Sequence, residues 1–157
     1  MSRDLDAVVP GPVAEALGAD PIPDDGLTIL VLTQRDGWPH VTMISRGEIV
    51  AAGPDRLRMA LWQHSSIVGA LERDGRASLS LVVDGVAYLL RVRAIRTGDL
   101  TTPLAGTLAR FDCTVEGATA DEAPYATIAS GVTFRLHDRA AVLARWQQVR
   151  AALAEAP

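Results

Sequence analysis

The chain has 157 residues, a formal net charge of −4 at pH 7 and a sequence pI near 5.3. A chain of this length can bury its own hydrophobic core, so we expect a single domain over residues 1–157. Proteins that bind nucleic-acid backbones usually concentrate basic residues, so the acidic balance argues against nucleic acid as a partner. All fifteen basic residues are arginine, which excludes a Schiff base on lysine and a lysine-tipped phosphate loop.

The sequence carries no recognisable targeting or anchoring signal. Its N-terminal residues lack the basic-then-apolar run of a secretory signal, and no apolar stretch approaches the ~20 residues of a membrane-spanning helix. We therefore expect a cytoplasmic protein that is not embedded in a membrane. The single cysteine, Cys113, cannot form an intramolecular disulfide and is more typical of a small buried hydrophobe than of a nucleophile.

The first half of the chain predicts a short helix and then two hairpins. Residues 1–26 form an expected N-terminal extension whose helix, over 12–19, is stopped by prolines and acidic residues. Runs of apolar and β-branched residues alternate with turn signals after that point. The predicted strands lie at residues 27–34, 40–45, 48–52 and 56–62.

The second half predicts a helix, further strands and a final helix. Ser65 or Ser66 can cap the first helix, whose end is marked by Asp74-Gly75. Asp138 caps the last helix, over 138–155, which carries an apolar stripe that includes Trp146. Between the helices we expect strands at 76–83, 87–95, 108–115 and 130–136, with a loop or a short helical turn at 97–106 and an exposed loop at 116–123.

Four segments occur in an order that resembles the pyridoxamine 5′-phosphate oxidase-like family. They are the hairpin with Asp36-Gly-Trp-Pro-His-Val-Thr-Met-Ile-Ser, the strand Arg56-Leu-Arg-Met-Ala-Leu-Trp, the Ser65-Ser66 helix and the strand that follows Gly75. The likeness covers roughly residues 27–95. It implies a mainly β (α+β) fold: an antiparallel split β-barrel of roughly six to seven strands, with a helix after the third or fourth strand and a C-terminal helix. It also implies a homodimer that binds FMN in a groove between its subunits.

The resemblance places the flavin contacts on the second strand, at the end of the third, and in the first turn of the next helix. A helix N-terminus suits a phosphate because its free N–H groups and partial positive charge point at the anion. Side chains alternate along a strand, so His40 and Thr42 are expected to share one face. The residues implied as cofactor-binding are His40, Thr42, Ser45, Arg46, Trp62, His64, Ser65 and Ser66.

Two functions remain open. The first is an FMN-dependent oxidoreductase acting on a small molecule, in which the flavin supplies the redox chemistry. The second is a non-catalytic binding module that holds another planar cofactor, such as a deazaflavin or haem, or that has lost its cofactor. Ile67 and Leu61 favour the second, because many flavin-binding members carry Lys or Arg, and Thr or Ser, at these positions. Hydrolysis finds little support without a Gly-x-Ser-x-Gly turn, and the histidine spacing predicts no metal site.

Overall fold

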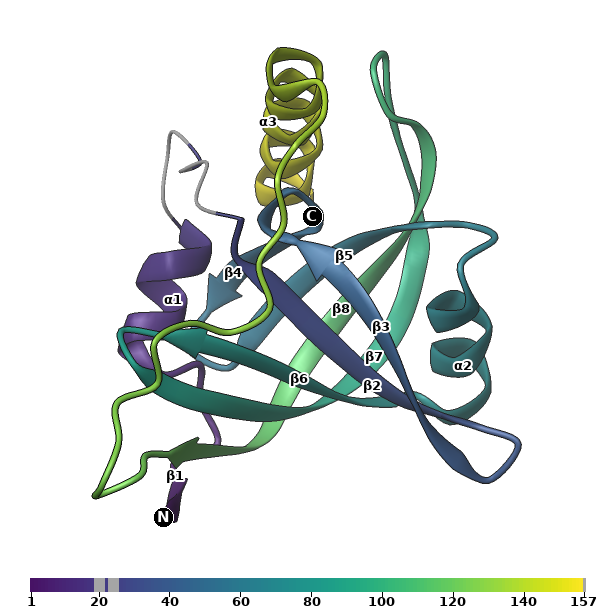
Figure 1. The fold of residues 1–157 in the computed structure, drawn as a ribbon. Coiled ribbons are helices and arrows are strands. Elements are labelled where there is room, and N and C mark those ends of the chain that lie inside the picture. Colours follow the sequence, from purple (N-terminus) through teal and green to yellow (C-terminus); the bar gives the residue numbers. More distant parts are fainter. Residues whose placement is uncertain (19–21, 23–25, 157) are drawn as a thin grey trace.

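The computed structural model describes residues 1–18, 22 and 26–156. One antiparallel sheet of eight strands follows the order β3-β2-β6-β7-β8-β5-β4, with β1 paired to β8 (Figure 1). This confirms the predicted split-barrel fold. The strands are β1 (Ser2–Leu5), β2 (Thr28–Arg35), β3 (Trp38–Ser45), β4 (Ile49–Gly53), β5 (Arg56–Trp62), β6 (Arg76–Val83), β7 (Val86–Thr102) and β8 (Gly106–Asp121). The helices are α1 (Gly11–Gly18), α2 (Ser66–Asp74) and α3 (Arg139–Glu155), with a 3₁₀ turn η1 (Arg46–Glu48).

Two hairpins form as their turn residues predict. Asp36 and Gly37 have φ values of 53° and 80°, and Asp84 and Gly85 have values of 50° and 80°. Positive φ at both central residues defines the turn whose twist matches that of paired strands. The Asp-Gly pairs therefore fix the registers of β2 with β3 and of β6 with β7.

Helix α2 begins and ends at the predicted residues. Ser65 is the N-cap, and its hydroxyl accepts a hydrogen bond from the Ile67 N–H. Gly75 adopts the left-handed conformation at the C-cap and donates its N–H to the Leu71 carbonyl at 2.8 Å. The buried face of the helix packs against β2 at one end of the barrel (Figure 1).

The long β7–β8 hairpin corrects two predictions. We expected a loop or a short helical turn at residues 97–106 and a loop at 116–123, but β7 continues to Thr102 and β8 to Asp121. A β-bulge between Arg96 and Gly98 absorbs the glycine that suggested a turn. The far part of β8 pairs on both sides, with β7 and with β1, which the sequence analysis did not predict.

The predicted strand at 130–136 is wrong. This segment belongs to an irregular connection that crosses the sheet between β8 and α3 (Figure 1), and it makes one bridge, from Thr133 to Leu27. The alternating pattern is real, but the segment runs beside β2, which already pairs with β3 on one side and β6 on the other.

Helix α1 confirms the expected N-terminal helix, although Ala19, its predicted last residue, lies outside the described residues. Helix α3 begins at its predicted cap, where Ala141 N–H donates to the Asp138 carboxylate at 3.2 Å. Its Trp146 is buried against η1 at Gly47, where a Cβ would overlap the indole ring. Glycine is therefore required at this contact.

Cys113 is fully buried in the main hydrophobic core. Burial, with a smaller contribution from the Asp112 charge, raises the pKa of its thiol to about 12. Because the thiolate is the nucleophilic form, Cys113 is excluded as a nucleophile near neutral pH. Among the described residues, no helix has the length and apolarity needed to cross a bilayer.

Candidate functional site

The structure brings together the second predicted strand and the start of α2. His40 Nε2 on β3 lies 3.2 Å from Ser66 Oγ, a hydrogen-bond distance between residues far apart in sequence. Ser65, beside it, caps the helix. Ser65 N–H donates to the Trp62 carbonyl at 2.9 Å, which fixes the turn from β5 into α2. Three predicted site residues therefore meet where the helix N-terminus carries its partial positive charge.

Two threonine hydroxyls lie on the same face of the β2–β3 hairpin. Thr33 is directly opposite His40, and Thr42 is two residues further along β3. Thr33 is 6% exposed. Within the described part of the chain, both hydroxyl oxygens are buried and have no hydrogen-bond partner. A buried unsatisfied polar group is costly, so these two hydroxyls mark a place that suits a polar ligand group.

Ser45 and Arg46 have structural contacts at the other end of β3. The Ser45 N–H and hydroxyl both donate to Glu48 Oε2, at 2.7 and 3.0 Å, and cap η1. Arg46 is buried and donates from Nη1 to the Ala16 carbonyl at 2.9 Å, which ties η1 to α1. Burial raises the pKa of Glu48, while the Ser45 hydrogen bonds and the Arg145 charge act in the opposite direction. Cofactor contacts from Ser45 and Arg46 stay a prediction.

Trp62 is half-exposed and lies under α3. The Arg145 guanidinium carbon is 5.3 Å from its ring centroid, close enough for a cation–π interaction. Arg145 Nε is itself buried and, among the described residues, without a hydrogen-bond partner. His64 is exposed on the turn between β5 and α2. The structure thus adds a cation beside Trp62 that the sequence analysis missed.

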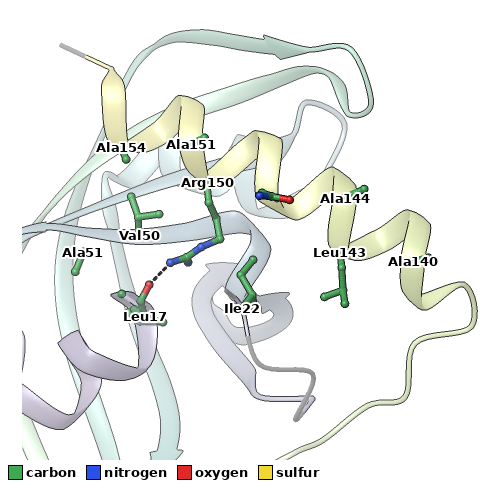
Figure 2. Close-up of a pocket in the computed structure, with 12 residues that line it drawn as sticks. Leu17, Ile22, Val50, Ala51, Ala140, Leu143, Ala144, Arg150, Ala151 and Ala154 are labelled. Carbon is green, nitrogen blue, oxygen red and sulfur yellow. Dashed lines mark hydrogen bonds between the residues drawn. The ribbon is translucent and has the colours of Figure 1, made fainter. Parts of the chain in front are cut away.

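A separate cleft of about 630 Å³ lies between α1, β4 and α3 (Figure 2). Arg150 points across it from α3 and donates to the carbonyls of Leu17, Arg46 and Ile49. These bonds join three elements, so Arg150 acts as a structural tie. Most of the remaining lining is alanine and leucine.

The sequence is similar to that of a bacterial protein. It is 33% identical over 120 residues to the uncharacterised protein YclD of Bacillus subtilis (strain 168), which covers 76% of this chain and 77% of YclD. The chain belongs to the YclD family. No known protein-family profile matches it.

Solved structures place this YclD-family chain among the split barrels. A candidate pyridoxamine 5′-phosphate oxidase from Lactobacillus delbrueckii has a TM-score of 0.57 at 13% identity, over 74% of this chain and 98% of that one. A HupZ variant from Group A Streptococcus has a TM-score of 0.55 at 10% identity, over 72% and 99%. The fold expected from the resemblance is confirmed.

The donor set at the α2 N-terminus of this YclD-family protein fits a phosphate group. It offers the Ser66 hydroxyl, the His40 ring and the partial positive charge of the helix N-terminus, while the Ile67 and Val68 N–H groups already donate to Ser65. Ile67 and Leu61 are each 1% exposed, so both side chains pack in the core. Neither side chain is therefore free to contact a ligand at the start of α2.

Thr33 is one of two residues near the site that sequence reasoning missed, the other being Arg145. Its signal was present, because the Asp36-Gly37 turn sets the register that places Thr33 opposite His40. No sequence pattern of this YclD-family protein predicts the contact of Arg145 with Trp62. The two residues are 83 positions apart, and only the docking of α3 brings them together.

Proposed function

We propose that the protein binds FMN with its phosphate at the N-terminus of α2, and that it is an oxidoreductase acting on a small molecule. The main support is the distance of 3.2 Å between His40 Nε2 and Ser66 Oγ, beside the N-cap of α2. His40, Ser65 and Ser66 would hold the phosphate by hydrogen bonds. Bound FMN would supply the redox chemistry at its isoalloxazine ring.

The unpartnered hydroxyls of Thr33 and Thr42 support the proposal. They lie on the same face of the β2–β3 hairpin as His40. Each would gain a hydrogen bond that the protein by itself does not provide, and this gain favours binding. Trp62 and His64 stay proposed contacts for the planar part of the cofactor.

The first test is uptake of FMN by the purified protein. We expect visible flavin absorbance to remain with the protein after gel filtration removes free FMN. Anaerobic addition of a reduced nicotinamide should then bleach the bound flavin if the protein is an oxidoreductase. A protein that takes up no FMN contradicts the proposal, and the same uptake assay with a deazaflavin or haem then tests the binding-module alternative. Retained FMN that no reductant bleaches favours a module that only binds flavin.

We also propose that the protein is a homodimer. Two apolar side chains on one face of edge strand β3 support this, since Val41 and Met43 are 52% and 63% exposed. Exposed apolar groups that lie together often mark an interface. Sedimentation velocity should show a dimer at micromolar concentration, and Met43→Glu should shift it toward monomer. A strictly monomeric wild-type protein would exclude the shared-groove arrangement.

A further inference from the structure

A groove on the outer face of the sheet gathers arginine side chains away from the α2 N-terminus. It encloses about 800 Å³, which lies within the range of small-molecule sites. One row of paired residues crosses it from β2 to β7, and residues directly opposite one another share a face. The row is Leu32, Ser78 and Arg91. The groove therefore has an apolar end at Leu32 and Pro39 and a cationic end on β6 and β7.

The positive charge at this cationic end is only partly neutralised. Arg93 pairs with Glu116 at 2.7 Å, and Asp74, also in the lining, is engaged by Arg73 at 3.1 Å. Across residues 1–18, 22 and 26–156, neither Arg76 nor Arg91 makes an ion pair or side-chain hydrogen bond. Two guanidinium groups are thus left with donors that match phosphate oxygens.

The strand register places like charges together. Arg76 is the direct cross-strand partner of Arg93, and Ser78 is the partner of Arg91. Like charges directly opposite one another destabilise a sheet. The chain as a whole has a net charge of −4. An anion bound between these arginine side chains would offset their mutual repulsion.

Gly117 provides room for one of these guanidinium groups. A Cβ at this position would overlap the Arg91 side chain at its guanidinium end. Arg91 and Gly117 are cross-strand partners, so the guanidinium lies over the bare backbone of β8. The position of the charge therefore depends on the absence of a side chain at Gly117.

We infer that this groove is a second binding site, for a small organic phosphate monoester. Arg76 and Arg91 hold the phosphate, Ser78 donates a hydroxyl, and the apolar part of the ligand lies along Leu32 and Pro39. A dianionic group with three oxygens can use two guanidinium forks at once. The apolar end of the groove selects an ester over inorganic phosphate.

Thr33 lines this groove as well as the proposed FMN site, but the phosphate contacts proposed for the two sites lie on different faces of the sheet. Val41 is the cross-strand partner of Leu32, so it shares the face of the groove. His40 is adjacent to Val41 on β3, so their side chains point to opposite faces of the sheet. The groove reaches Asp74 at the C-terminal end of α2. A nine-residue helix rises about 1.5 Å per residue, so its two ends are roughly 12 Å apart.

The test is calorimetric titration of phenyl phosphate into the Ser66→Glu protein, in a low-salt buffer that contains no phosphate. This background blocks an anion at the α2 N-terminus, so failure of the FMN proposal and failure of this one remain distinguishable. We expect saturable binding that is tighter than that of inorganic phosphate. Arg91→Gln should weaken it about tenfold or more, since a charge-assisted contact is lost.

Two further variants sharpen the result. Gly117→Ala keeps every charge but displaces the Arg91 guanidinium, so it should also weaken binding. Arg3→Gln, at an exposed arginine on β1, removes the same charge elsewhere and should leave the affinity unchanged. Equal losses in Arg91→Gln and Arg3→Gln would mean a general charge effect and would overturn the proposal. So would absence of saturable binding, or a change of sedimentation in Arg91→Gln, which would make this face a contact between two copies.

Discussion

Replacing Ser66 by glutamate is expected to weaken FMN binding by at least about tenfold. Ser66 Oγ lies 3.2 Å from His40 Nε2 at the start of α2, where the proposal seats the phosphate. Two like unit charges about 4 Å apart repel by about 4 kcal/mol at an effective dielectric constant near 20. Ser66 is exposed, so solvent screening reduces the effect to the smaller expected loss. The measurement is the dissociation constant of FMN from quenching of flavin fluorescence.

The matched control for this experiment is Ser66→Gln, which has the same side-chain length without the charge. We expect it to retain most of the affinity of the wild-type protein, because its amide can still donate a hydrogen bond. Equal affinities for the Glu and Gln variants would place the phosphate away from the helix start. Circular dichroism of both variants checks that α2 still forms.

Replacing Trp146 by alanine should lower the free energy of unfolding by about 3–5 kcal/mol. Trp146 is 6% exposed and meets Phe134 edge to face, with ring centroids 6.1 Å apart. Its indole also fills the space over Gly47 in η1. Loss of the ring leaves a cavity under α3 and frees the connection that precedes the helix. Urea unfolding followed by far-UV circular dichroism measures the effect.

Trp38→Ala is the control, since Trp38 is 75% exposed and its removal should change stability by less than about 0.5 kcal/mol in a monomeric preparation. Gly47→Ala should cost about 1–3 kcal/mol, because its Cβ and the indole compete for one space. In the double variant the two costs should not add. A Trp146→Ala variant no less stable than Trp38→Ala would show that α3 does not dock through this residue.

Local features of this fold were predictable because each depends on residues close in sequence. The Asp36-Gly37 turn, the Ser65 cap and the Asp138 cap each follow from one or two side chains acting on the neighbouring backbone. Part of the candidate site was predictable for the same reason. The alternation along β3 put His40 and Thr42 on one face, and the cap placed Ser66 in the first turn of α2.

The contacts between these elements could not be predicted in the same way. Ser45 and Arg46 were expected near a cofactor, yet their hydrogen bonds are to Glu48 and to the Ala16 carbonyl of α1. The partner of Arg46 lies 30 positions away, so no local pattern indicates it. The same is true of Arg145, which reaches Trp62 only because Trp146 docks α3 on η1.

The sequence by itself determined which segments up to residue 95 form helices or strands, and it determined the Asp-Gly turns and the helix caps. Only the tertiary structure decided which candidate strands pair. The segment around Thr133 alternates like a strand but runs beside β2, whose two sides already pair with β3 and β6, whereas the far end of β8 pairs with both β1 and β7. A strand is stable only when its backbone groups find a partner edge. The availability of that edge, like the meeting of His40 with Ser66, depends on residues far apart in the chain.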